Sequence, residues 1–149
     1  MVFDVDGFKV SIRKCRKSDY GFVFKVTKAT LFKYISKYRK LDLKKFRDDF
    51  YESCKDTVIL MSKGRRIGLF QLDKKKNCLE IVKIVISPAY HGRGIGWFLM
   101  KYFETLGFSK ICLQVWENNP AYHFYKELGY KVIRKINHKI HMEKTIIKS

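Results

Sequence analysis

The chain has 149 residues, of which 32 are Lys or Arg and 14 are Asp or Glu, so its formal net charge is +18. A hydrophobic content of 46% with 15% aromatic residues excludes a disordered chain, and the length is typical of one domain, which we expect to span residues 1–149. No apolar run is long enough to cross a bilayer, and the first six residues lack the basic start and apolar stretch of a signal peptide. We therefore expect a cytoplasmic protein without a membrane segment.

In the first third of the chain, the residue pattern predicts one strand followed by two helices. Residues 8–13 alternate between apolar and polar side chains, which indicates a half-buried strand. Ser18 or Asp19 can cap a helix, and only Gly21 would interrupt that helix before Tyr38. The second helix should follow Asp42, because apolar side chains then recur on one helical face.

Three strands are predicted in the middle of the chain. Residues 57–62 and 67–72 should form a hairpin, since Lys63 and Gly64 between them are typical turn residues. A polar loop then leads to residues 78–87, which form the most apolar stretch of the set. We expect this third strand to lie at the centre of the sheet.

In the rest of the chain, the residue pattern predicts a helix, a strand, a second helix and a final hairpin. Apolar residues with helical spacing run from Gly94 to Gly107, and a strand follows at residues 111–115. A short helix should stop at Gly129, and the tail should fold back at Asn137-His138. The order indicates an α/β (α+β) fold with a central mixed, mostly antiparallel sheet and about four flanking helices.

A glycine-rich loop between the central strand and the next helix is the most informative feature. Gly92, Gly94 and Gly96 alternate with other residues and remove side chains where a ligand could approach the backbone. The free amides of the first helical turn would attract an anion, helped by the helix dipole. Leu99 stands where a dinucleotide-binding motif needs its third glycine, and no Gly-Lys-Ser/Thr follows as in a P-loop. The pattern predicts a pyrophosphate site of another type.

Two motifs resemble those of the GNAT superfamily of N-acetyltransferases. The family's pyrophosphate motif, Arg/Gln-x-x-Gly-x-Gly/Ala, is matched by His91, Gly94 and Gly96, with His91 in place of Arg or Gln. Its later motif, Asn-x-x-Ala-x-x-Leu/Phe-Tyr-x-x-x-Gly-Phe/Tyr, is matched by the residues Asn118, Ala121, Phe124, Tyr125, Gly129 and Tyr130. The motifs occur in the family's order and are separated by one strand.

The resemblance implies that acetyl-CoA is the cofactor and suggests which residues bind it. The pantetheine arm would pair with the strand backbone at Ile84, Val85 and Ile86. The pyrophosphate would lie on the loop formed by His91, Gly92, Arg93, Gly94, Ile95, Gly96 and Trp97. Asn118 would touch the cofactor, with Asn119 as the alternative because it directly precedes Pro120 and suits an N-cap. His91 is interpreted as a loop residue without a catalytic role.

The resemblance also implies direct attack of an amine on the thioester, with a general base and a general acid. Tyr125 takes the position of the acid, and it also contacts the cofactor. Glu80 is the candidate base, because Leu79-Glu80-Ile81-Val82 resembles the histone-acetylating branch at its catalytic glutamate. Strict alternation would place Glu80 on the same strand face as Ile84 and Ile86. Glu117 and a chain of water molecules remain alternatives.

The acceptor has no motif, so only its charge can be discussed. A charge of +18 should repel polyamines and favour a protein or peptide N-terminus or lysine in acidic surroundings, although a small-molecule amine remains an alternative. The same charge permits a different interpretation, a non-catalytic basic module that binds nucleic acid. No metal site is predicted, because the four cysteines form no CxxC pair. Both a monomer and a homodimer are compatible with the sequence.

Overall fold

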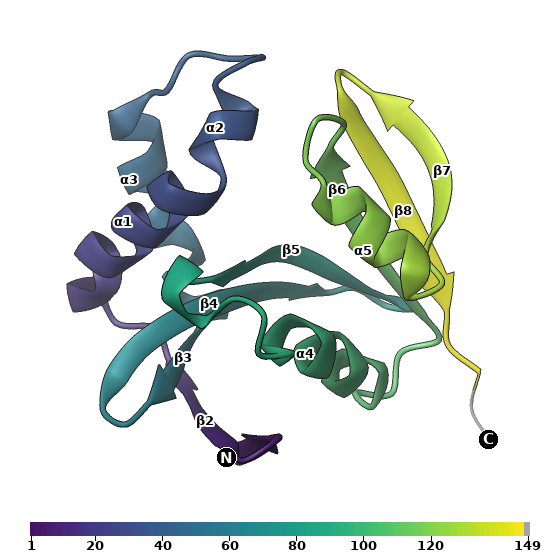
Figure 1. Cartoon of the computed structure of the whole chain (residues 1–149). Coiled ribbons are helices and arrows are strands. Elements are labelled where there is room, and N and C mark those ends of the chain that lie inside the picture. The colour runs from purple at the N-terminus through teal and green to yellow at the C-terminus, as the bar shows by residue number, and fades with distance from the viewer. Residues whose placement is uncertain (148–149) are drawn as a thin grey trace.

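The computed structural model describes residues 1–147 and builds them around one twisted sheet (Figure 1). Its strands are β1 (Val2–Val5), β2 (Phe8–Lys14), β3 (Thr57–Ser62), β4 (Arg65–Lys74), β5 (Cys78–Ile86), β6 (Lys110–Trp116), β7 (Lys131–Ile136) and β8 (Lys139–Thr145). They lie in the order β1-β2-β3-β4-β5-β6-β8-β7. Within this described sheet only β5 and β6 are parallel neighbours, so the predicted mixed, mostly antiparallel sheet is confirmed.

Five α-helices flank the described sheet. They are α1 (Tyr20–Thr30), α2 (Phe32–Ile35), α3 (Leu43–Ser53), α4 (Ile95–Glu104) and α5 (Ala121–Glu127). Buried side chains of α4 and α5 belong to one core cluster, and those of α1 and α3 belong to another. The two clusters occupy opposite faces of the sheet, because adjacent strand residues such as Ile59 and Leu60 divide between them. No helix of the described residues is both long enough and apolar enough to cross a membrane.

The element order agrees with the sequence prediction except in the first third of the chain. There, β1 precedes and pairs with β2, whereas the predicted sheet began at residue 8. The first predicted helix is also interrupted at Leu31, which separates α1 from the single turn α2. Thr30 lies at this interruption, and its hydroxyl donates a hydrogen bond to the Val26 carbonyl (2.8 Å), a contact that tends to bend helices.

The predicted turns occur where the sequence placed them. Asn137 and His138 connect β7 to β8 with φ angles of 49° and 68°, the left-handed conformation that a tight hairpin turn requires. Residues 63 and 64 likewise connect β3 to β4. Strand β5 lies between β4 and β6, as its apolar sequence predicted.

A β-bulge in β5 changes which side chains share a face. The pairing with β4 passes from Ile81 directly to Lys83, so Val82 is the extra residue. Ile81 before the bulge and Ile84 after it both pack toward α4 and α5, whereas Val85 packs toward α1 and α3. The prediction that Glu80 shares a face with Ile84 and Ile86 is therefore wrong, because the bulge reverses the alternation between them.

Strands β5 and β6 separate along their length. They pair only from Cys78 to Ile81 on β5 and from Lys110 to Leu113 on β6, and beyond these residues they diverge (Figure 1). The divergent half of β5 leads into the glycine-rich loop, and the divergent half of β6 leads toward α5. The sheet therefore opens at its centre, beside the residues that the sequence singled out.

Candidate active site

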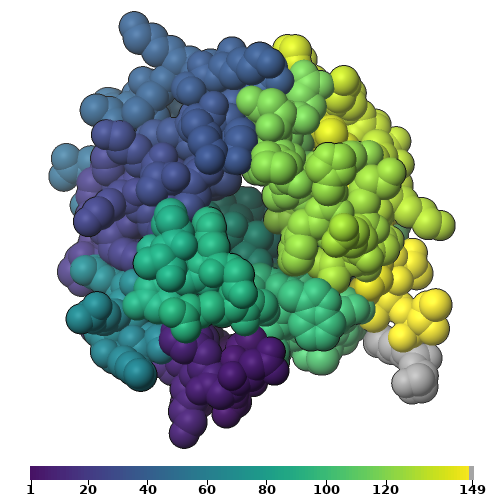
Figure 2. Space-filling model, viewed as in Figure 1, coloured from purple at the N-terminus to yellow at the C-terminus, as the bar shows by residue number. Residues whose placement is uncertain are grey.

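A cavity of about 560 Å³, here called the glycine-loop cavity, lies beside this opening. Its walls come from the α1–α2 connection, the end of β5, the loop before α4 and the first turn of α5. Figure 2 shows the corresponding hollow between the blue segment, the green loop and the yellow-green helix. Segments distant in the sequence thus form one binding space.

The glycine loop presents backbone amides to this cavity. Gly92 and Gly94 have φ angles of 77° and 81°, which other residues rarely adopt, and α4 begins at Ile95. The Phe98 amide is the first to donate within the helix, to the Gly94 carbonyl (3.0 Å). The amides of residues 95–97 have no partner among the described residues, so the loop can hold a phosphate-type anion.

The end of β5 supplies a second backbone surface. After Ile81 the edge of β5 that faces β6 has no strand partner, and Ile84, Val85 and Ile86 line the cavity. Unpaired strand backbone can bind an extended ligand that carries amide groups. His91 Nε2 donates a hydrogen bond to the Ile86 carbonyl (2.7 Å), which ties the loop to the strand.

A second cavity, of about 420 Å³ and here called the α3 cavity, lies next to the first. It is lined by α1, α2, the loop to α3, α3 itself, the middle of β5, the end of β6 and Lys139 of β8. Leu31, Ile84, Asn119 and Tyr125 line both cavities. The two spaces therefore meet at the opening between β5 and β6.

Tyr125 lies at this junction with a hydroxyl that has no protein partner. The residue is 9% exposed, and its hydroxyl forms no hydrogen bond within residues 1–147. Burial raises the pKa of Tyr125 to about 12, so the phenol stays protonated at neutral pH. A buried proton donor thus stands between a cavity that could hold an anion and a second cavity that could admit another reactant.

The comparison with protein families agrees with this geometry. Residues 25–130 match the model of the "Acetyltransferase (GNAT) family", which covers more than half of the chain. The chain belongs to the GNAT acetyltransferase family. It is an acetyl-CoA-dependent acyltransferase that acts on an amine acceptor.

Solved GNAT structures share the fold over nearly the whole chain. The PaiA N-acetyltransferase from Thermoplasma acidophilum, solved with coenzyme A, is 20% identical and has a TM-score of 0.73, covering 91% of this chain and 98% of its own. An acetyltransferase from Thermus thermophilus is 14% identical with a TM-score of 0.75, covering 91% and 96%. The ribosomal-protein-S18-alanine N-acetyltransferase from Escherichia coli is 14% identical with a TM-score of 0.70, covering 94% and 96%. No curated protein sequence matches the chain.

Most of the cofactor residues predicted from the GNAT resemblance line the glycine-loop cavity. They are Ile84, Val85, Ile86, His91, Gly92, Gly94, Ile95, Gly96, Trp97 and Tyr125. Arg93 does not line it, because its guanidinium lies over the rings of Phe8 (4.7 Å) and Tyr90 (5.6 Å).

The structure places Asn118 and Asn119 differently with respect to the two cavities. Asn118 lines neither cavity, and its side-chain amide donates to the Tyr34 carbonyl (3.2 Å). Asn119 lines both cavities and also accepts a hydrogen bond from the Ala121 amide (2.9 Å) at the start of α5. The structure therefore favours Asn119, the alternative from helix-capping rules.

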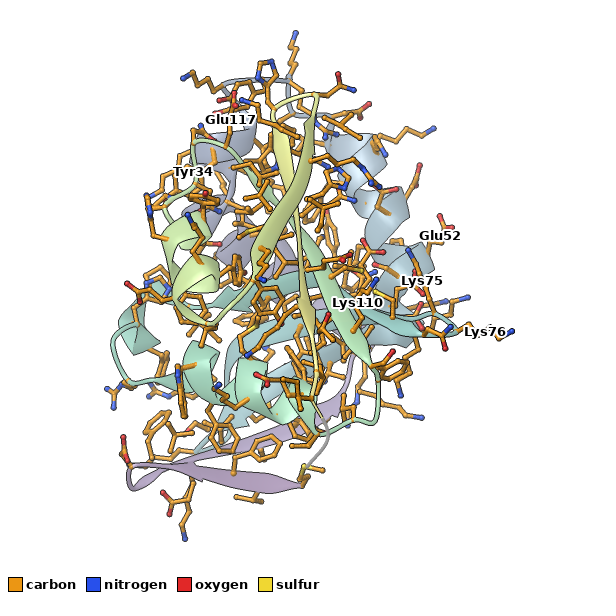
Figure 3. All side chains as sticks on the ribbon, turned by 90° about the vertical axis from the view of Figure 1, so that its right-hand side faces the viewer. Tyr34, Glu52, Lys75, Lys76, Lys110 and Glu117 are labelled. Atoms are coloured by element: carbon orange, nitrogen blue, oxygen red, sulfur yellow. The ribbon has the colours of Figure 1, made fainter. Side chains whose placement is uncertain are left out.

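The two candidate carboxylate bases lie in different surroundings. Glu80 lines the α3 cavity, and its carboxylate lies 2.9 Å from Lys75 Nζ. Glu117 lines neither cavity, and hydrogen bonds from Lys135 and His138 lower the pKa of Glu117 to about 2. Figure 3 shows Glu117 near Tyr34 at one end of the molecule and Lys75 well away from it. Glu117 is thus a poor general base, since its proton affinity is low.

The sequence reasoning missed the cations of the α3 cavity, which are Arg39, Lys40, Lys45, Lys83 and Lys139. Three of them, Arg39, Lys83 and Lys139, contact aromatic rings of the same cavity. Lys83 could have been noticed, because it is the one charged residue in the run from Ile81 to Ile86 of a central strand. Arg39 and Lys139 carry no comparable signal, since lysine and arginine occur along the whole chain. Only the tertiary fold brings these three side chains to one cavity.

Proposed function

We propose that this GNAT enzyme transfers the acetyl group of acetyl-CoA to a primary amine of a peptide or protein, by direct attack of the amine. The observation that supports this most strongly is the position of Tyr125 at the junction of the two cavities, with a free hydroxyl. A peptide acceptor also fits one structural neighbour, which is named for the alanine of ribosomal protein S18.

The glycine-loop cavity is the proposed cofactor site. The amides of residues 92–97 would hold the pyrophosphate, and the free edge of β5 at Ile84–Ile86 would bind the pantetheine amides. Asn119 would contact the cofactor from the start of α5. When bound there, acetyl-CoA supplies the activated acetyl group and a sulfur leaving group.

Tyr125 is the proposed general acid. Its hydroxyl would donate a proton to the leaving sulfur as the carbon–sulfur bond breaks and the carbon–nitrogen bond forms, and the phenolate would then be reprotonated from solvent. The pKa of about 12 keeps the phenol protonated at neutral pH, so its proton is available for the leaving sulfur.

Glu80 is the proposed general base for the acceptor ammonium. It lines the α3 cavity, where the acceptor would enter opposite the cofactor. Its side chain is 20% exposed, so the proton can pass from the amine directly or through one water molecule and then to solvent. Lys75 holds the carboxylate at the cavity wall through the 2.9 Å ion pair.

The substitution Tyr125→Phe tests the proposal, because it keeps the ring and removes only the proton donor. We expect the turnover rate, measured as release of free thiol, to fall by about 10²-fold. The dissociation constant of coenzyme A, measured by calorimetry, should change little.

Tyr130→Phe is the matched control. Tyr130 is also buried, its ring lies 6.1 Å from that of Tyr125, and its hydroxyl likewise has no partner among residues 1–147, but it lines neither cavity. Removal of the Tyr130 hydroxyl should leave the turnover rate unchanged. Full activity of Tyr125→Phe, or an equal loss in both variants, would contradict the role of Tyr125 as the acid.

A further inference from the structure

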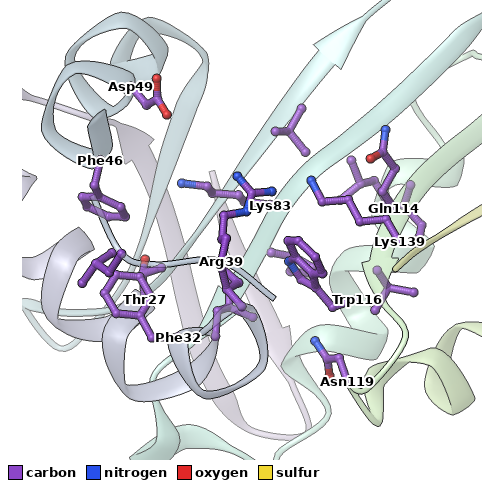
Figure 4. Close-up of a pocket in the computed structure, with 18 of the residues that line it drawn as sticks. Thr27, Phe32, Arg39, Phe46, Asp49, Lys83, Gln114, Trp116, Asn119 and Lys139 are labelled. Atoms are coloured by element: carbon purple, nitrogen blue, oxygen red, sulfur yellow. The ribbon is translucent and has the colours of Figure 1, made fainter. Parts of the chain in front are cut away.

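Three cationic side chains line the α3 cavity, contact its aromatic rings and form no ion pair within residues 1–147. Arg39 comes from the loop before α3, Lys83 from β5 and Lys139 from β8, and Figure 4 shows Arg39 and Lys139 beside Trp116 and Lys83 on the side of Phe46. None of the three forms an ion pair with a carboxylate of residues 1–147. Cations from three separate elements thus share one concave surface.

The acidic residues of the same cavity are already engaged. Asp49 forms an ion pair with Lys45 (3.1 Å), and Asp42 accepts a hydrogen bond from the Lys45 amide (3.0 Å) as the N-cap of α3. Glu80 pairs with Lys75. None of these carboxylates forms an ion pair with the three cations, although the charge of Asp49 still acts on Lys83.

Aromatic rings fix the positions of the cations. Arg39 and Lys139 lie over the ring of Trp116, at 5.0 Å and 4.9 Å from its centroid, and Lys83 Nζ lies 5.3 Å from the centroid of Phe46. Such contacts orient a cation but bring no negative charge to it.

The cluster has an electrostatic cost in the absence of a ligand. Burial lowers the pKa of Lys83 despite the opposing charge of Asp49. Burial and the charge of Arg39 lower the pKa of Lys139. An anion placed among the three groups would offset the desolvation of Lys83 and Lys139 and the repulsion between Arg39 and Lys139.

We infer that the acceptor carries a carboxylate close to its reacting amine, and that Arg39, Lys83 and Lys139 bind this carboxylate. The inference rests on the proposed function, since it assigns the α3 cavity to the acceptor. The cavity of about 420 Å³ contains both the cations and Tyr125, so the carboxylate and the amine belong to the same end of one molecule. A peptide with an acidic N-terminal sequence and a free acidic amino acid share this chemistry.

Binding of charged and neutral probes to the protein saturated with coenzyme A tests this inference. The probes are peptides that begin Glu-Glu or Gln-Gln and are otherwise identical, together with free glutamate and glutamine. We expect the Glu-Glu peptide or glutamate to bind at least about tenfold more tightly than its amide counterpart, the size of one charge-assisted hydrogen bond. A preference within the peptide pair identifies a peptide as the acceptor, and a preference within the amino-acid pair identifies a free amino acid.

Two triple variants separate the local effect from the overall charge. The first triple variant carries Lys83→Met, Arg39→Gln and Lys139→Gln. It should lose the preference for acidic over amide probes without a change in the affinity for coenzyme A. Lys25→Gln with Lys55→Gln and Lys131→Gln removes three exposed charges outside both cavities and should retain it. Equal binding of acidic and amide probes, or loss of the preference in both triple variants, would overturn the inference.

A parallel assay of thiol release from acetyl-CoA separates this inference from the proposed function. Tight binding of an acidic probe without acetylation would support the carboxylate site and contradict the proposed transfer. Acetylation of acidic and amide probes at equal kcat/KM would support the transfer and contradict the carboxylate site.

Discussion

At the scale of single residues, Asp19 shows how a buried charge stabilises this fold. Its side chain is 1% exposed and accepts hydrogen bonds from Arg13 of β2 (2.8 Å to each oxygen), the Arg16 amide (2.8 Å) and Arg66 of β4 (3.2 Å). The sequence identified Asp19 only as a possible helix cap. The carboxylate instead joins two strands to the start of α1, and it lines neither cavity.

The pKa of Asp19 predicts how stability depends on pH. Hydrogen bonds, first of all from Arg13, lower the pKa from 3.8 to about 2, so the stabilisation is complete above pH 4 and is lost as pH falls through 2. We expect the free energy of unfolding to fall by about 2 kcal/mol from this group between pH 5 and pH 2. Asp19→Asn should lose a similar amount at pH 7 and show a shallower acid dependence in urea unfolding. The same acid dependence in both proteins would refute this role.

At the scale of elements, the bulge in β5 determines which groups face the α3 cavity. Because Val82 is an extra residue, Glu80 lines the α3 cavity while Ile84 and Ile86 pack toward α4 and α5. A single inserted residue thus allows one strand to contribute a carboxylate to one cavity and its backbone to the other.

The substitution Glu80→Gln tests whether this carboxylate is the base. It preserves size and removes basicity, so the pH–rate profile should lose its acidic limb and activity should partly recover at high pH, where the free amine is abundant. Lys75→Gln is the control, since it breaks the ion pair and leaves the carboxylate. A profile like that of wild type, or the same change in both variants, would assign Glu80 a structural role and leave ordered water as the base.

Local features of the fold could be read from the sequence, whereas features that depend on the backbone register could not. The turn at Asn137-His138 and the start of α4 after Gly94 follow from the conformations that those residues favour. The bulge at Val82 has no sequence signal, because Ile81, Val82 and Ile84 are all apolar and fit either register. Asn118 and Asn119 are a second such case. They are neighbours in the sequence, but only Asn119 lines the cavities.

At the scale of the whole molecule, the site is formed where the sheet opens. The α3 cavity is lined by residues as distant in the sequence as Thr27 and Lys139, and no local pattern could predict that they lie close together. Likewise, only the tertiary structure shows which of the positive charges lie together. Most lysines are spread over the surface, but Arg39, Lys83 and Lys139 line one cavity.

A crystal structure of the chain with acetyl-CoA tests the central claim most directly. We predict the pyrophosphate on the amides of residues 92–97, the pantetheine between the divergent halves of β5 and β6, and the sulfur within hydrogen-bond reach of the Tyr125 hydroxyl. The acetyl group should point into the α3 cavity. A cofactor bound outside the glycine-loop cavity, or a sulfur beyond the reach of Tyr125, would contradict the account.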